Sequence, residues 1–189
     1  NVRSGGGGSI TIKAQNVDVV GGSELLAGIS EGLGSPEAQG GDIEINATGR
    51  INLADDSLIS NEVEKNAVGN SGNVKIKTGS LSVNNGSVIG SLILGKGNAG
   101  NVTIEASDTV ILDRRDSEVF TGVASNVGTG SEGNGGVITI TTDSLEVKNG
   151  ARISADTFGQ GNGGGVTITT DSLEVKNGAT ISASTFAQG

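Results

Sequence analysis

Cysteine, histidine, methionine, tryptophan and tyrosine are all absent from this chain, and phenylalanine, at three positions, is its only aromatic residue. Without histidine or cysteine, the chain has neither a histidine base to activate a nucleophile nor a thiol nucleophile. A broad core of aromatic side chains is also excluded, which leaves narrow columns of Ile, Val and Leu. The lack of cysteine does not define a redox compartment, but it means that no disulfide can lock the chain during export.

Long hydrophobic runs and basic clusters are missing as well. No stretch of about 18 apolar residues occurs, so no segment is predicted to cross a membrane as a helix. The formal net charge is −9 and the twelve basic residues are scattered, whereas binding to a phosphate backbone needs a basic stripe. We therefore expect no nucleic-acid partner.

An internal repeat is the strongest positive feature. The segment TITTDSLEVKNGA occurs unchanged at residues 139–151 and 167–179, a spacing of 28 residues. Self-similarity at such a period is typical of a solenoid.

The same apolar spacing recurs six times, and each unit contains three short strands in which inward residues alternate with outward ones. The first pairs are Ile10/Ile12, Ile43/Ile45, Val74/Ile76, Val102/Ile104, Ile138/Ile140 and Val166/Ile168. The second pairs are Val17/Val19, Ile51/Leu53, Leu81/Val83, Val110/Leu112, Leu145/Val147 and Leu173/Val175. The third positions are Leu25, Ile59, Ile89, Val119, Ile153 and Ile181.

One such unit cannot bury its own apolar face, but stacked units pair strand on strand at about 4.8 Å and enclose a continuous core. The sequence therefore predicts an all-β fold, a parallel β-helix of about six three-stranded coils. We expect one segment over residues 1–189, with coils at about 5–39, 40–70, 71–98, 99–134, 135–162 and 163–189.

The turn residues fit this prediction. Asn-Gly at residues 85–86, 149–150 and 177–178 lies between second and third strands, where a sharp corner needs positive φ. Gly-Gly pairs at 21–22, 40–41, 135–136 and 163–164 indicate further corners and coil starts. We expect the extra residues of the longer units in loops, for example at 125–133, and a single long loop at 121–134. Phe120, Phe158 and Phe186 follow third strands and are expected to plug the corner of the core.

Carboxylates and arginines are the remaining candidates for catalysis. Parallel β-helices include polysaccharide lyases and hydrolases, so Asp55-Asp56 and the run Asp113-Arg114-Arg115-Asp116 could form such a site. Aspartate is also favoured in the turn after a strand, and this interpretation is preferred. The two arginines are flanked by aspartates that cancel their field, so we expect no cleavage of uronate polymers and assign no catalytic residue.

Two further patterns bear on metal and ice binding. Asp143 and Asp171 should stack at one corner, which favours turn capping over a weak cation site. The glycine-rich segments lack the aspartate of calcium-binding β-roll repeats, so no metal or cofactor is predicted. Threonines 139, 141, 167 and 169 form a small array, but charged residues occupy the equivalent positions in other units, so we interpret them as β-formers on a solvated face.

The outward charges are predicted to pair between coils. Glu44 should lie beside Lys75, and Lys77 beside Glu105. The like-charge neighbours Glu146/Glu174 and Lys148/Lys176 should be offset by a diagonal pair between them, either Lys148 with Glu174 or Glu146 with Lys176. None of these pairs indicates a binding site.

The order GNAG-x-V-T-I at residues 97–104, with SLEVKNGA-x-ISA-x-TFGQGN within residues 135–162, resembles the repeats of large bacterial exoproteins related to filamentous haemagglutinin, especially cyanobacterial ones. The resemblance covers essentially the whole chain and is looser at residues 25–34 and 55–66. It implies a right-handed parallel β-helix that is exported by the two-partner route. The Asn-Pro-Asn element of the family's secretion domain is missing, and Pro36 is the only proline. The resemblance therefore points to the shaft and transfers no functional residue.

We accordingly expect a structural shaft or adhesive segment of a longer protein, secreted or on the cell surface, and not an enzyme. The alternative is a polysaccharide-active parallel β-helix enzyme. Expected partners are an outer-membrane export pore of the two-partner type, bound through a segment not in this chain, other copies by end-to-end coil stacking, and a cell-surface or polysaccharide target.

Overall fold

The computed structural model describes residues 7–115 and 117–186. Within these residues the protein is all-β, with sixteen strands and no helix, so no helix long and apolar enough to span a membrane occurs there. The strands are β1 (Ile10–Ala14), β2 (Val17–Val20), β3 (Glu24–Ile29), β4 (Gly34–Gln39), β5 (Ile43–Ala47), β6 (Arg50–Ala54), β7 (Leu58–Val63), β8 (Val68–Asn70), β9 (Val74–Asn84), β10 (Val88–Ile93), β11 (Val102–Asp113), β12 (Gly122–Val127), β13 (Val137–Lys148), β14 (Arg152–Ser154), β15 (Gly165–Val175) and β16 (Thr180–Ser182).

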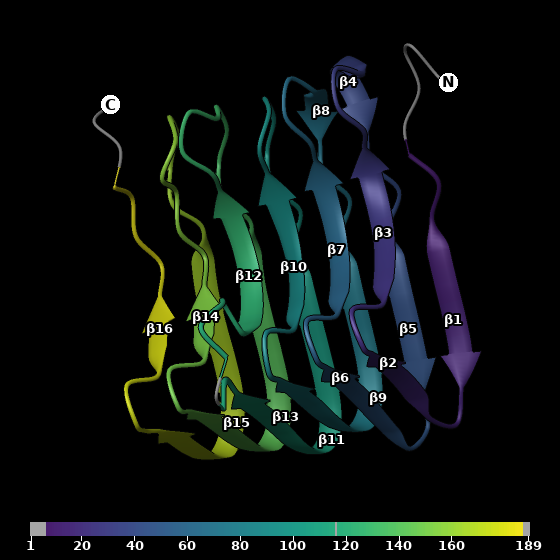
Figure 1. Cartoon of the computed structure of the whole chain (residues 1–189), viewed down its shortest axis with the longest axis vertical. Coiled ribbons are helices and arrows are strands. Elements are labelled where there is room, and N and C mark those ends of the chain that lie inside the picture. The colour runs from purple at the N-terminus through teal and green to yellow at the C-terminus, as the bar shows by residue number, and fades with distance from the viewer. Residues whose placement is uncertain (1–6, 116, 187–189) are drawn as a thin grey trace.

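The strands stack as the parallel solenoid that the repeat predicts. One sheet has the order β1-β5-β9-β11-β13-β15, with β2 and β6 alongside; a second has the order β16-β14-β12-β10-β7-β3; and β4 pairs with β8. Every paired strand lies parallel to the equivalent strand one coil away, and Figure 1 shows the six coils side by side in chain order. Equivalent side chains therefore form columns along the axis.

The predicted columns make the main core. The first and second pairs of coils 2 to 5 are at most 2% exposed, and Ile59, Ile89 and Ile153 of the third column are fully buried. Except for Val19, the equivalent side chains of the two end coils are only partly buried or exposed, because no coil covers them on one side. We refer to the sheet that contains β1 and β15 as the long wall and to the sheet that contains β3 and β16 as the short wall.

The first two strands of a coil were expected to be separate, which is wrong for coils 3 to 6. There they merge into single strands of 11 or 12 residues, β9, β11, β13 and β15. A threonine lies at the bend of three of these strands and closes it: the Thr142 hydroxyl donates to carbonyls of Asp108 or Ser144 at 3.1 and 3.3 Å. Thr78 and Thr170 make equivalent bonds. The bend is thus gentle enough for strand pairing to continue through it.

The sharp corner lies where Asn-Gly predicts it. Asn85, Asn149 and Asn177 have φ between 49° and 54°, and the glycine after each also has positive φ. The Gly21-Gly22 pair turns the same corner in coil 1, with φ of 66° and 73°.

Coil 4 departs from the prediction. Val119 is 53% exposed, and Val123 takes its place in the third column between Ile89 and Ile153. Leu112 and Val123 are eleven residues apart, whereas the equivalent Val147 and Ile153 are six apart. Most of the insertion therefore precedes the third strand, and the expected loops at 121–134 and 125–133 are wrong because β12 occupies residues 122–127.

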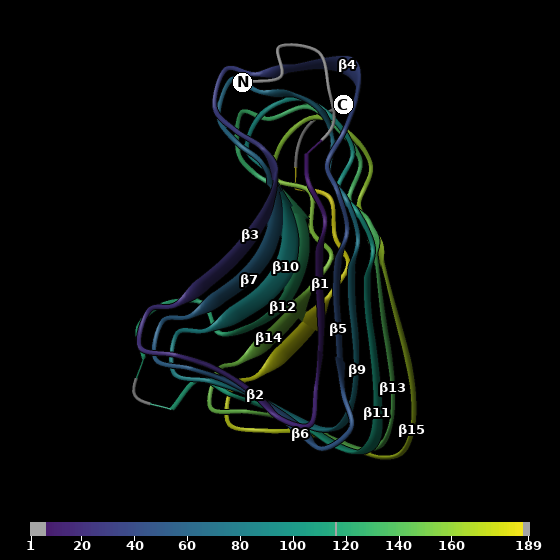
Figure 2. The same cartoon turned by 90° about the vertical axis from the view of Figure 1, so that its right-hand side faces the viewer.

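A second, smaller core was not predicted. Six buried residues form it at the end of the short wall and in the segments that follow: Ile29, Ala38, Val63, Ala67, Ile93 and Val127. Seen along the stack in Figure 2, the chain narrows to a waist and then widens into a small lobe that contains β4. Polar side chains fill the waist: the Ser91 hydroxyl accepts from the Gly100 N–H at 2.8 Å, and the Ser125 hydroxyl donates to the Gly100 carbonyl at 2.9 Å.

Candidate functional surfaces

The Gly-Asn-x-Gly segments at residues 69–72, 97–100, 133–136 and 161–164 form the far side of the waist. Their asparagines make a ladder: Asn98 Oδ1 accepts from the backbone N–H and the Nδ2 of Asn134, at 3.0 and 2.9 Å. Asn70 accepts from Asn98, and Asn134 from Asn162, in the same way. The first glycine of each segment has φ between 135° and 151°. The recurrence of this motif is therefore explained by coil stacking.

The aspartates considered for catalysis are turn residues. Asp55 and Asp56 both have φ of 59°, and Asp55 Oδ1 accepts from Asn85 Nδ2 at 2.8 Å in the next coil. Asp113 is 9% exposed and accepts from Asn149 Nδ2 at 2.8 Å and from the Arg115 backbone N–H at 3.0 Å. The bonds from Asn85 and Asn149 continue the Asn-Gly corner from coil to coil, so the carboxylates of Asp55 and Asp113 both help to stack the coils.

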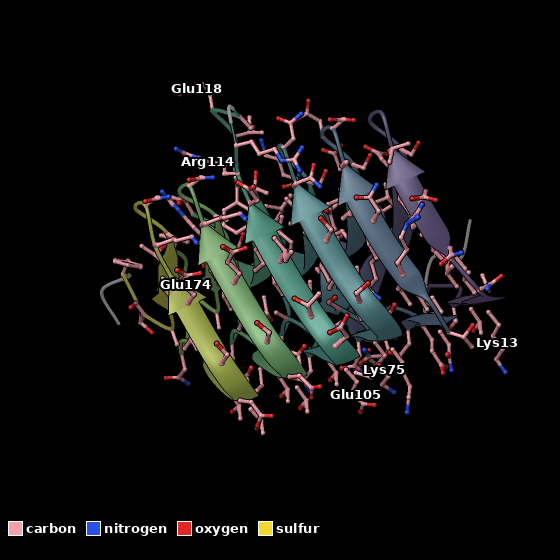
Figure 3. All side chains as sticks on the ribbon, turned by 90° about the horizontal axis from the view of Figure 1, so that it is seen from below. Lys13, Lys75, Glu105, Arg114, Glu118 and Glu174 are labelled. Carbon is pink, nitrogen blue, oxygen red and sulfur yellow. The ribbon has the colours of Figure 1, made fainter. Side chains whose placement is uncertain are left out.

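The arginines of this corner do not converge on one point. The Arg115 Nε lies 3.6 Å from Asp113, whereas the Arg114 guanidinium packs against Gly150 of the next coil. Asp116, the fourth member of the predicted cluster, lies outside the described residues. Figure 3 shows Arg114 and Glu118 at this corner, away from Lys75 and Glu105 on the long wall.

The Asp143/Asp171 pair does stack on adjacent coils, because the flanking residues Thr142/Thr170 and Ser144/Ser172 are in register. Both aspartates are exposed. Among the residues that the structure describes, no group of three or more acidic, histidine or cysteine side chains could hold a metal ion.

The outer face of the long wall carries the predicted charge pairs. Glu44 lies opposite Lys75, although the ion pair of Lys75 is with Asp42 at 3.6 Å. Lys77 lies opposite Glu105 and pairs with it at 3.5 Å. At such exposed positions these pairs stabilise the fold by at most about 1 kcal/mol each.

A denser charge network lies on the last two coils. Glu146 contacts Lys148 and Lys176, each at 2.7 Å, and Lys176 also contacts Glu174 at 2.8 Å. The hydrogen bonds from the two lysines lower the pKa of Glu146 from 4.5 to about 2, and those from Glu146 and Glu174 raise the pKa of Lys176 to about 12. The expected diagonal pair of Glu146 with Lys176 is confirmed. The network offsets the like-charge stacking of Glu146 on Glu174.

The outward threonines near the C-terminal end of the long wall lie in two columns. Thr103, Thr139 and Thr167 form one column, and Thr141 and Thr169 belong to the other. Toward the N-terminus the same columns contain Lys75, Glu44, Glu105 and Lys77. The array is therefore an uncharged end of a charged face.

The phenylalanines were expected to plug the core, and this is wrong for two of them. Phe158 and Phe186 are 42% and 63% exposed, and their rings stack on each other with centroids 5.0 Å apart at 4°. The residues before them, Thr157 and Thr185, pair as neighbours in adjacent coils, so the rings form a short column on the outside of the small lobe. Phe120 is half-buried.

The outer side of the short wall is recessed, and we call it the concave face. Its central column consists of Leu26, Ser60, Gly90, Ala124, Ser154 and Ser182. Ser60, Ala124 and Ser154 are only 2 to 6% exposed although they point away from the core. Figure 2 shows the strands of this wall curving inward between the corner turns and the small lobe.

Two carboxylates lie beside that central column. Asp156 is 6% exposed and accepts from the Ser154 and Ser182 hydroxyls at 2.7 Å and from the Ser184 N–H at 2.8 Å. Glu62 is half-buried, and burial, reinforced by Glu64 and Glu24, raises its pKa above 4.5 despite a bond from Ser60. The concave face thus has mostly small side chains along its centre and carboxylates beside them.

The chain matches no family model, no curated protein and no solved structure. The resemblance to exoprotein repeats therefore stays a hypothesis based on the residues quoted above.

Proposed function

We propose that this chain is a structural shaft segment of a secreted or cell-surface exoprotein, a rigid rod that presents other parts of the molecule. The observation that supports this most directly is the continuity of contacts along the axis. Strand pairing, the asparagine ladder and the side-chain hydrogen bonds at the Asn-Gly corner each link one coil to the next. In a repeat array each unit contacts only its neighbours, so contacts of this kind are what hold the coils together in one rod.

The concave face and the outer face of the long wall run the length of the stack. They are the surfaces that an adhesive role would use, with a cell-surface molecule or polysaccharide as the target. Export through an outer-membrane pore of the two-partner type, and hence the extracellular location, are parts of the proposal that rest on the resemblance alone.

A shaft should tolerate a change in its number of coils. Residues 139–151 and 167–179 are identical in sequence, so deletion of residues 152–179 removes one coil of 28 residues. Residue 180 then follows the same sequence as it does in the original chain. We expect the shortened chain to unfold in a single transition by circular dichroism and to be shorter by about 4.8 Å, the spacing of one strand.

The matched control deletes residues 152–175, which removes less than one repeat and places two corners in tandem. This variant should lose cooperative unfolding. If the in-register deletion unfolds the chain as the control does, the coils are not modular and the shaft proposal is wrong. Turnover of pectate or alginate that disappears in Arg114→Ala or Arg115→Ala would favour the enzyme alternative instead.

A further inference from the structure

The small lobe has a notch at the level of coil 3. Between equivalent paired positions, the turn of coil 3 spans residues 93–96, whereas the turns of coils 2 and 4 span residues 63–68 and 127–132. The two longer turns flank the shorter one and leave a recess of about 390 Å³, large enough for one or two side chains. All three turns line it, with Lys65, Asn66, Leu94, Gly95, Lys96, Thr129 and Gly130.

The insertion of coil 4 forms a protrusion at the Asn-Gly corner, which we define by residues 117–119. Glu118 and Val119 are exposed, and Figure 3 shows Glu118 at the outer tip of this corner. The protrusion folds back over coil 3, because Thr121 Oγ1 accepts from the Gly86 N–H at 2.8 Å and a Cβ added to Gly86 would lie 3.0 Å from a methyl carbon of Val119. The protrusion and the notch therefore lie at the same level along the stack.

The chemistry of the protrusion complements that of the notch. No ion pair between described residues includes Lys65 or Glu118. Each of these two charges has a large apolar side chain nearby, since Leu94 in the notch is 41% exposed and Val119 on the protrusion is 53% exposed. Contact between Leu94 and Val119 would bury apolar surface and bring opposite charges together, which favours one partner orientation over others.

We infer that two copies of this chain pair side by side, with Glu118 and Val119 of each copy seated in the notch of the other. Figure 2, which looks along the stack, shows the corner turns and the small lobe at opposite margins of the concave face. A two-fold axis parallel to the stack brings two concave faces together, exchanges these margins and keeps every coil at its level. Each protrusion then meets a notch, and the contact closes as an isologous dimer. The inference uses side surfaces alone and does not rest on the shaft proposal.

Reversal of the two charges tests the contact. Glu118→Lys places like charges at the notch, and so does Lys65→Glu, so each should raise the dimer Kd at least about tenfold in sedimentation equilibrium. The double variant Glu118→Lys/Lys65→Glu restores an opposite pair and keeps the net charge of −9, so its Kd should return to within about threefold of the original value.

Matched controls separate this contact from the effect of net charge. Glu44→Lys and Lys13→Glu make the same charge changes at exposed positions on the outer face of the long wall. Both should leave the Kd nearly unchanged. A chain that is monomeric at every concentration, a dimer that is insensitive to Glu118 and Lys65, or a double variant that stays as weak as the single ones would overturn the inference.

Disulfide trapping tests the geometry, since the chain has no cysteine of its own. A disulfide needs Cα atoms about 4.4–6.8 Å apart, so it reports direct contact. A mixture of Leu94→Cys and Val119→Cys chains should form covalent dimers under mild oxidation, whereas each variant alone, or Val119→Cys mixed with Thr141→Cys, should form far fewer.

All three positions are exposed, so the reduced variants should melt like the original chain. Equal cross-linking in the mixture and in the controls would contradict the seating of Val119 on Leu94. The coil deletion described above removes neither the protrusion nor the notch, so its outcome is independent of this one.

Discussion

Ile140 and Thr141 are adjacent on β13 but face opposite sides of the long wall. Ile140 is fully buried, whereas Thr141 is exposed. Ile140→Asp places an unpaired carboxylate in the core and should lower the free energy of unfolding by roughly 3–5 kcal/mol. Thr141→Asp should change it by less than about 1 kcal/mol. Denaturant or thermal melts followed by circular dichroism compare the two, and equal effects would contradict the register of the whole column.

Glu146 gives the stability a defined response to acid. Its pKa is about 2 in the folded protein, below the ordinary 4.5, so the folded state binds its proton less readily than the unfolded state. The stabilisation is complete above about pH 4.5 and is lost as the pH falls from there toward 2. Its side chain is 21% exposed, which limits the contribution to less than about 1 kcal/mol.

Melting temperatures measured between pH 6 and pH 2 test this assignment. Glu146→Gln should flatten the acid side of the profile, whereas Glu174→Gln leaves both lysines on Glu146 and should keep it. Parallel profiles for Glu146→Gln and the unaltered chain would show that the lysine contacts do not lower this pKa in solution.

Within a coil, the glycine segments at the waist bring the backbones of neighbouring coils into close contact. A Cβ added to Gly100 would overlap the carbonyl oxygen of Gly72 in the preceding coil, whereas a Cβ on Gly165 would meet nothing closer than 3.8 Å. Neither glycine has positive φ, so the comparison isolates packing from backbone strain. Gly100→Ala should cost at least about 2 kcal/mol, and Gly165→Ala should be neutral or raise stability by about 0.5 kcal/mol. Urea titrations measure both; equal midpoints would contradict the close approach.

The elements that could be predicted from the sequence are those with a regular apolar period. The columns of the main core and the Asn-Gly corners are correct because each coil repeats the same spacing against its neighbour. Val119 was wrongly assigned to the third column because it lies at nearly the usual distance in sequence from the second pair. Val123 occupies the column instead, since the next inward residue, Ser125, then hydrogen-bonds to Gly100 and Gly136.

The small core was missed because its main apolar residues do not fall in alternating apolar pairs. Val63, Ile93 and Val127 each end a third strand, and none has an apolar residue two positions before or after it. A search for alternating apolar pairs therefore passes over all three. Their burial follows from the widening of the chain beyond the waist, which depends on contacts between coils.

The candidate surfaces were harder to predict than the core. Outward pairs such as Lys77 and Glu105 follow directly from strand register, so they could be foreseen. The exposed stack of Phe158 on Phe186 could not, because the sequence does not show that the small lobe leaves those rings outside. Likewise, the concave face depends on the curvature of the short wall, and its central column has no distinctive spacing.

For the molecule as a whole, the identical segments at residues 139–151 and 167–179 leave the placement of the last two coils undecided by their own sequence. Among the described strands, β11 alone shifts register against two neighbours, between Glu105 or Ala106 and Thr109. Either segment would fit that shifted edge equally well, because the residues that face it are the same in both. The order of the coils along the chain therefore decides which segment pairs with β11, so connectivity specifies here what side-chain chemistry does not.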